Sequence, residues 1–198
     1  MTQVQAKYLK DYQAPQFTIE SIDLDVNLNG KNTVVKAISK VKRSSSHANP
    51  LVLDGEGLTL VSVAIDGQQV AYQVGEGQLT IETTLNEFEL TIITQLDPEA
   101  NSSLEGLYMS DGAYCTQCEA EGFRRITYFL DRPDVLAKYT VRIEADKLAF
   151  PFLLSNGNLI DKGELDGGRH YVRWQDPFPK PAYLFALVAG DFDLLQDE

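Results

Sequence analysis

Apolar and polar side chains alternate along much of the first hundred residues, a pattern typical of strands with one buried face. In residues 22–28, apolar residues alternate with acidic or amide residues. A turn at residues 29–32 leads into a second run, residues 33–43, which is rich in β-branched side chains. We therefore expect these two runs to pair as a β-hairpin.

Further short apolar runs continue along the chain, separated by turns that contain glycine. They predict strands at residues 51–53, 58–65, 70–74, 79–82, 88–96, 139–143, 171–174 and 183–189. The last run is almost wholly apolar, so we expect it to be central in a sheet. Residues 131–137 offer at most a single helical turn, with Pro133 at its first position. The pattern predicts an all-β fold, a sandwich or a curved sheet with long loops and at most short helical turns.

Residues 101–123 show no sustained alternation, so we expect a long irregular loop there. A loop of that length inside a domain is usually functional or disordered. Its aromatic residues and two cysteines argue against disorder. Functional residues are therefore best sought in this segment.

The composition of the 198 residues changes this picture in two ways: 43% are hydrophobic, enough for one substantial core, and the net charge is −12. Such a charge repels nucleic acid and anionic bilayers, so neither is expected as a partner. No apolar run is long enough for a transmembrane segment, and the first residues do not resemble a signal peptide. With only two cysteines, the expected location is the cytoplasm.

Cys115 and Cys118 have the spacing of half a zinc site or of a redox pair. A structural zinc site needs four ligands, and His47 and His170 stand alone in their segments, where we expect surface or edge positions. The acidic residues after Cys118 raise a thiol pKa instead of lowering it. We therefore expect packing thiols and no metal bound by this chain.

No recognisable catalytic group is present in the sequence. It contains neither a Gly-x-Ser-x-Gly turn nor a His-Glu-x-x-His string. We expect no catalytic residue in this chain.

Glu119 and Glu121 are carboxylates two positions apart in the segment of residues 101–123. One of them could pair with a cation such as a substrate ammonium, or both could be solvated without a specific task. Judged from the residues alone, the solvated interpretation is favoured, because exposed acids are abundant in this chain.

Five runs of the sequence share one resemblance: SLEGLY (103–108), CTQCEAEGFR (115–124), YFLDRPDV (128–135), PFLLSNGN (151–158) and DPFPKPAYLFALVAGDF (176–192). Together they resemble the bacterial aminopeptidase N family of zinc-dependent alanyl aminopeptidases. The opening residues Gln5–Tyr8, Asp11, Tyr12, Ala14 and Pro15 fit the same family.

The resemblance implies that residues 1–198 are the amino-terminal domain, a saddle-like antiparallel β structure, of a protein several times longer. That protein would release the first residue from peptides with a free amino terminus. Its zinc would be bound by a catalytic domain that is absent from this chain and that would be a partner of this domain. In the family, the residue at the position of Glu119 binds the substrate α-ammonium, and the residue at the position of Gln117 lines the pocket for the first side chain. No such role falls to Glu121, which we expect to be structural. Residues 131–134 are expected to form an ion-paired turn that braces the segment of residues 101–123, which we call the recognition loop.

A second hypothesis keeps the β pattern and sets the resemblance aside. It is a stand-alone, non-catalytic β-sandwich module that binds a peptide or another protein. A coding sequence that continues into Gly-x-Met-Glu-Asn and His-Glu-x-x-His would exclude this alternative.

Overall fold

The computed structural model describes residues 8–44 and 49–195, which consist of strands joined by loops and short 3-10 turns. The turns are η1 (Leu9–Asp11), η2 (Phe123–Arg125), η3 (Asp166–Gly168) and η4 (Ala182–Leu184). The strands are β1 (Phe17–Asn27), β2 (Thr33–Arg43), β3 (Leu51–Asp54), β4 (Thr59–Ile65), β5 (Gln68–Gln69), β6 (Gln73–Gly75), β7 (Gln78–Ile81), β8 (Glu87–Leu96), β9 (Gly106–Ser110), β10 (Ala113–Gln117), β11 (Ala137–Asp146), β12 (Phe152–Ser155), β13 (Asn158–Leu165), β14 (Arg169–Lys180) and β15 (Leu187–Gly190). The predicted all-β fold class is confirmed. No helix among the described residues is long and apolar enough to cross a membrane.

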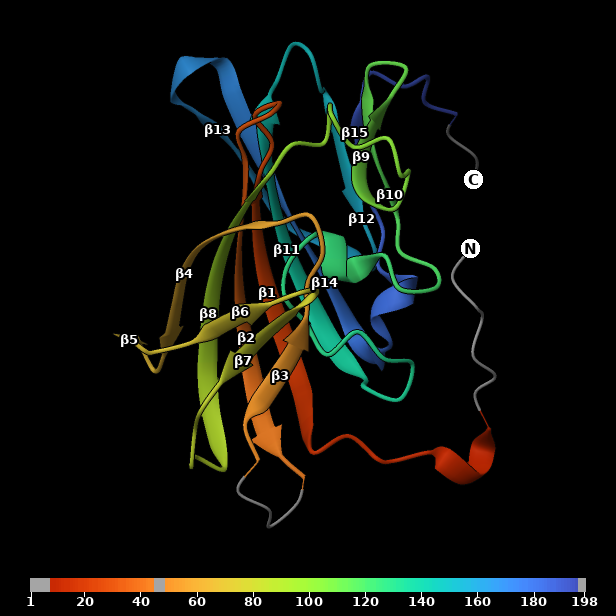
Figure 1. The fold of residues 1–198 in the computed structure, drawn as a ribbon. Coiled ribbons are helices and arrows are strands. Elements are labelled where there is room, and N and C mark those ends of the chain that lie inside the picture. The colour runs from red at the N-terminus through yellow and green to blue at the C-terminus, as the bar shows by residue number, and fades with distance from the viewer. Residues whose placement is uncertain (1–7, 45–48, 196–198) are drawn as a thin grey trace.

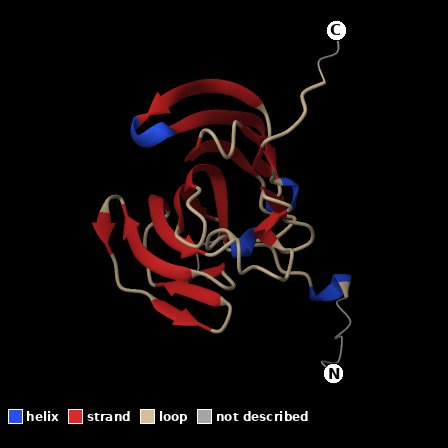
Figure 2. Cartoon of the chain, turned by 90° about the horizontal axis from the view of Figure 1, so that it is seen from above, coloured by secondary structure: helices blue, strands red, loops and turns tan. Residues whose placement is uncertain are grey.

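The strands of the described residues form three sheets (Figure 1). The large sheet has eight strands in the order β13-β14-β11-β1-β2-β8-β4-β5, and the smaller ones have the orders β12-β15-β10-β9 and β3-β7-β6. Seen from above, the strands follow a curve instead of lying in one plane (Figure 2). One core cluster contains residues from all three sheets, among them Leu24, Leu79 and Tyr114, so the core lies between the large sheet and the small ones.

The alternation along the chain corresponds to the two faces of the large sheet. Leu24 on β1 and Ile143 on β11 are both fully buried on its inner face. On the outer face, Arg142 forms ion pairs of 3.0 Å with both Asp25 and Glu144. The predicted hairpin of residues 22–43 is confirmed, because β1 and β2 pair in antiparallel register.

The large sheet is mixed, which the expectation of an antiparallel sheet did not include. β1 pairs with β2 in antiparallel fashion on one side and with β11 in parallel on the other. A parallel pair requires a long crossover between its strands. Here the crossover contains the whole three-stranded sheet and the strands β9 and β10 of the four-stranded sheet. Because that pairing joins distant segments, no local pattern indicates it.

The expectation of an irregular loop over residues 101–123 is wrong, because β9 and β10 form a hairpin there. Its turn is Asp111-Gly112, with φ angles of 47° and 79°. Two central residues with positive φ are the requirement of a type I′ turn, for which Asp-Gly is a preferred pair. The dipeptide was therefore a usable signal, although the strands around it are short and only partly apolar.

The apolar run of residues 183–189 is only in part a strand. It begins within η4 and becomes extended in β15. The predicted central position is confirmed, since β15 lies between β12 and β10. The strands β12, which pairs with β15, and β13, which pairs with β14, were not predicted.

Two side chains considered for chemistry lie inside the fold. His170 is only 8% exposed, and its Nε2 lies 2.8 Å from the carbonyl oxygen of Phe150, so the expected surface or edge position is wrong. It is buried because it lies on the same face of β14 as Val172, which is also 8% exposed and belongs to the core. His47 lies outside the described residues.

Cys118 is 3% exposed, and burial, with a further effect from the charge of Asp131, raises its pKa to about 12.

The two free thiols should differ in reactivity. The thiolate is the reactive form, and Cys115 is more accessible than Cys118. We expect iodoacetamide at about pH 8, near the usual thiol pKa, to label Cys115 in the native protein and to leave Cys118 unlabelled, as measured by peptide mass spectrometry. Both should react after denaturation, and equal labelling of the native protein would contradict the buried position of Cys118.

Phe123 should be a major determinant of stability. It is fully buried, and its ring contacts those of Phe129, Phe185 and Tyr139 at centroid distances of 4.9, 5.2 and 5.9 Å. We expect Phe123→Ala to lower the free energy of unfolding by about 3–5 kcal/mol in urea denaturation. The control is Phe178→Ala, since Phe178 is 76% exposed and its loss should change stability by less than about 0.5 kcal/mol.

Candidate functional site

The β9–β10 hairpin positions the two residues that the sequence singled out. Gln117 is the last residue of β10, and Glu119 lies two positions later in the connection to η2. Thr116 fixes this end of the hairpin, because its hydroxyl donates to the carbonyl of Leu187 at 3.0 Å and accepts from the amide of the same residue at 2.8 Å. Near the other end of β10, the Tyr114 hydroxyl accepts a hydrogen bond of 2.8 Å from the amide of Gly30. The hairpin is thus attached to β15 and to the β1–β2 turn.

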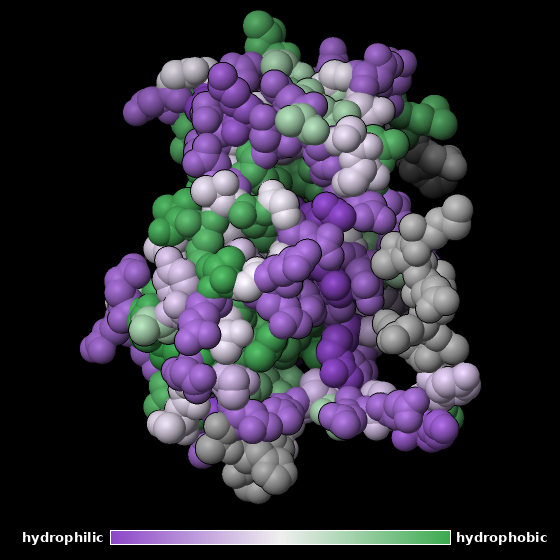
Figure 3. Space-filling model, in the orientation of Figure 1, coloured by the Kyte–Doolittle hydropathy of each residue, from purple (hydrophilic) through white to green (hydrophobic). Residues whose placement is uncertain are grey.

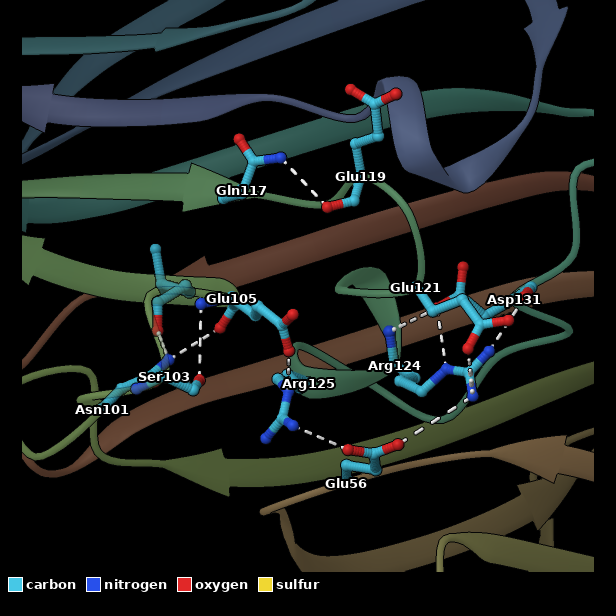
Figure 4. Close-up of polar contacts among 11 residues, drawn as sticks. Glu56, Asn101, Ser103, Glu105, Gln117, Glu119, Glu121, Arg124, Arg125 and Asp131 are labelled. Carbon is cyan, nitrogen blue, oxygen red and sulfur yellow. Dashed lines mark hydrogen bonds and ion pairs between the residues drawn. The ribbon is translucent and has the colours of Figure 1, made fainter. Parts of the chain in front are cut away.

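Gln117 and Glu119 are brought together, and both are exposed. The side-chain amide of Gln117 donates to the backbone carbonyl of Glu119 at 3.1 Å (Figure 4). The peptide bond between Glu119 and Ala120 is cis. Among the described residues, none forms a hydrogen bond or an ion pair with the carboxylate of Glu119. This carboxylate is therefore available to a ligand.

Glu121 has a different environment from Glu119. Its carboxylate lies 3.5 Å from the guanidinium of Arg124, and the two glutamate side chains point away from each other (Figure 4). The predicted structural role of Glu121 agrees with this contact. The two carboxylates therefore differ in the charge that each of them faces.

The loop between Cys118 and Gly122 passes so close to its neighbours that a side chain at Gly122 would collide with them. A Cβ there would lie 2.3 Å from the carbonyl oxygen of Gln117. The amide of Gly122 also donates to the carbonyl of Cys118 at 2.9 Å, which closes the loop on itself. The backbone around Glu119 is thus held at its two ends.

Arg124 lies directly after this loop and is surrounded by acidic groups. Its backbone amide and its Nε each donate to Oδ2 of Asp131 at 3.1 Å, and its Nη2 donates to the carbonyl of Asp131 at 3.1 Å. Asp54, the last residue of β3, and Glu56, on the β3–β4 connection, have carboxylate oxygens 3.9 Å from the same guanidinium. Hydrophilic side chains accordingly cover the middle of the face that carries η2 (Figure 3).

The cluster is partly buried, and this affects its acids. The side chain of Asp131 is 2% exposed, and that of Arg124 is 14% exposed. Burial raises the pKa of Asp131 above its usual range, while the hydrogen bonds from Arg124 act in the opposite direction. The pKa of Asp54 is also raised, again mainly by burial. These carboxylates consequently depend on Arg124 for charge compensation.

Arg125 extends the network to the start of the hairpin. It pairs with Glu56 at 2.8 Å and with Glu105, just before β9, at 3.1 Å. Gly106 lies beside it with a φ of +70°, where a Cβ would be 2.6 Å from the Cβ of Arg125. The start of β9 is therefore joined to η2, the element that follows β10 along the chain.

The predicted brace of residues 131–134 differs in part from the structure. Asp131 contacts the recognition loop, but through Arg124. The sequence pattern did not single out this arginine, because two of its partners, Asp54 and Glu56, are distant in the chain. Arg132 and Asp134 pair with each other at 2.7 Å, and Asp134 also accepts a hydrogen bond of 3.0 Å from Tyr12. Instead of a helical turn, residues 132–135 form a turn closed by a 3.2 Å bond from the amide of Val135 to the carbonyl of Arg132.

In the part of the chain that the structure describes, no group of three or more His, Cys, Asp or Glu side chains is arranged to hold a metal ion. The acidic residues around Arg124 have that cation as their partner. The exposed carboxylate of Glu119 beside the amide of Gln117 is chemically suited to a cationic, hydrogen-bonding group.

Comparisons with known proteins agree with the fold. Residues 11–184 match the family described as the Peptidase M1 N-terminal domain. Aminopeptidase N of Escherichia coli (strain K12) is 57% identical over 196 residues, which are 98% of this chain and 22% of that protein. The chain thus spans less than a quarter of the length of this relative.

Two solved structures are similar in fold. The crystal structure of Legionella pneumophila aminopeptidase A in complex with aspartic acid has a TM-score of 0.89 and 40% identity, covering 93% of this chain and 22% of that one. The M1 zinc metallopeptidase of Deinococcus radiodurans has a TM-score of 0.77 at 19% identity, covering 89% of this chain and 43% of that one, which shows the fold alone. With a family match over most of its length, the chain belongs to the peptidase M1 N-terminal domain family.

Proposed function

We propose that this chain is the substrate-recognising amino-terminal domain of a zinc-dependent aminopeptidase, which releases the first residue from peptides with a free amino terminus. Family membership supports this proposal, as does the identity of 57% to a protein named Aminopeptidase N. The relative is several times longer than this chain, so the catalytic domain is assigned to another part of the parent protein. In this proposal the catalytic domain packs against the present domain.

The observation that carries the proposal is the environment of Glu119. Its carboxylate is exposed and has no partner among the described residues, whereas the loop around it is fixed at both ends. A substrate α-ammonium is a complementary ligand, because a charge-assisted hydrogen bond to a carboxylate is among the stronger polar contacts. Its strength increases where a neighbouring domain and the substrate exclude water.

A carboxylate at a fixed position also accounts for exopeptidase selectivity. Only the first residue of a peptide carries the ammonium group that Glu119 would bind. A peptide bound through an internal residue would leave the carboxylate desolvated and unpaired, which is unfavourable. Gln117, whose amide lies beside Glu119, is proposed to line the pocket for the first side chain.

The proposal assigns no zinc ligand to this chain. The described residues lack a suitable group, and the acids nearest the recognition loop face Arg124. The zinc of the parent protein is therefore placed in its catalytic domain. The cytoplasm remains the proposed location, and the free state of both cysteines is compatible with a reducing compartment.

The Legionella relative supports the ligand class. It was solved with aspartic acid, which carries a free α-amine. At 40% identity over nearly the whole chain, that protein is similar enough for the same class of ligand, an α-amino compound, to be proposed here.

Removing the charge of Glu119 should impair the parent enzyme. We expect Glu119→Gln in the full-length protein to lower kcat/KM for an amino-acid amide by about 10²-fold, because a desolvated ion pair is lost. Most of the change should be in KM if the ammonium is bound equally in the ground state and the transition state.

The matched control for this substitution is Glu82→Gln. Glu82 is exposed, follows β7 and has no partner among the described residues. Its substitution should leave kcat/KM within about twofold, the scale expected of a surface change. A Glu119→Gln enzyme that is as active as the Glu82→Gln control would remove Glu119 from the site.

The 198-residue chain alone should be inactive. We expect no release of amino acid from an amide substrate with or without added zinc, because the described residues hold no metal site and the sequence contains no recognisable catalytic motif. The full-length enzyme at equal concentration is the positive control. Zinc-dependent turnover by the purified domain, in a preparation free of host peptidases, would contradict the proposal.

A further inference from the structure

We propose that Arg124 and Asp131 are positioning residues that determine where the Glu119 carboxylate lies, and that they affect substrate binding only through it. This inference rests on the proposed function. It concerns two side chains that are themselves turned away from the carboxylate of Glu119 (Figure 4).

The first argument is the geometry of the loop. Residues 118–122 begin at the end of β10, which Thr116 attaches to β15, and end at η2. Two of its residues hold η2 in place: Phe123 is buried in the core, and Arg124 pairs with Asp131. Glu119 lies between these anchors, so its position depends on the distance between them.

The second argument is the number of separate contacts that Asp131 makes with Arg124. A single carboxylate oxygen accepts from both the backbone amide and the Nε of Arg124, each at 3.1 Å. The backbone contact fixes the peptide group at the start of η2, and the side-chain contact fixes the direction of the guanidinium. The same guanidinium then reaches Glu121 at 3.5 Å, within the loop itself. The pair therefore contacts the loop and the element that follows it.

The third argument is charge. Arg124 is within 4 Å of the carboxylates of Asp54, Glu56, Glu121 and Asp131. Without the guanidinium these groups repel one another, and Asp131 is too buried to be solvated. Glu121 would move away from the cluster and would displace the backbone next to Glu119. A displacement of about 1 Å in a binding group can reduce catalysis by as much as about 10²-fold.

The test is a double-mutant cycle in the full-length enzyme with Glu119→Gln, Arg124→Lys and both together. Lysine keeps the charge but loses the forked geometry of arginine, which limits the loss of stability. We expect Arg124→Lys to lower kcat/KM by about tenfold through KM, and by less than about twofold when Glu119→Gln is already present.

Arg142→Lys is the matched control. Arg142 also pairs with two carboxylates, and its side chain is 21% exposed, but it lies on the outer face of the large sheet. It should change kcat/KM by less than about twofold in either background. If Arg124→Lys does not fold, Asp131→Asn takes its place in the same cycle, with the same expected coupling to Glu119→Gln.

The outcomes separate this inference from the proposed function. Equal losses from the Arg124 substitution with and without Glu119 would show that Arg124 acts independently of it, and would overturn the positioning role alone. So would an Arg124→Lys enzyme with unchanged KM. An unchanged kcat/KM for Glu119→Gln would instead overturn the function proposed for the domain.

Discussion

The arrangement of the recognition loop depends on the contact between Arg124 and Asp131. Asp131 is almost completely buried, so its charge requires a partner, and Arg124 supplies both a guanidinium and a backbone amide. The same arginine reaches the end of β3 through Asp54 and the β3–β4 connection through Glu56. One cation thereby joins the acidic residues on either side of it in sequence, Glu121 and Asp131, to the distant Asp54 and Glu56, and the hairpin with its loop is attached where they meet.

This arrangement separates two carboxylates that are nearly adjacent in sequence. Glu121 belongs to the acidic cluster and is compensated by Arg124, whereas Glu119 has no partner among the described residues. A binding residue must retain unused hydrogen-bonding capacity while its backbone stays fixed. The loop meets both requirements because the stabilising contacts involve the residues on either side of Glu119.

The sequence predicted those parts of the fold that depend on neighbouring residues. The β1–β2 hairpin followed from alternation and a turn, and the central position of β15 followed from its apolar run. The parallel pairing of β1 with β11 could not be predicted, since register between distant strands leaves no local pattern. His170 was placed at the surface because a glycine turn precedes it, but its burial is decided by the face of β14 that it shares with Val172, which packs in the core.

The candidate site was predictable to a similar extent. The resemblance to a family singled out Gln117 and Glu119, and the structure places them in contact. The bracing arginine was not identified, because nothing in its immediate neighbours shows that Asp54 and Glu56 approach it. The hairpin itself was missed although Asp111-Gly112 is a strong turn signal, because its strands are exposed on one side and carry little alternation.

The parallel pairing of β1 and β11 also has a consequence during protein synthesis. Asp25 on β1 and Arg142 on β11 are 117 positions apart, whereas β2 follows β1 directly. At roughly 5–20 residues per second, a ribosome needs on the order of ten seconds to deliver β11 after β1. During that interval β1 has one unpaired edge, which other chains could join. Asp23 and Asp25 place negative charge along this strand, so the carboxylates that form ion pairs in the folded sheet also discourage association of the nascent chain.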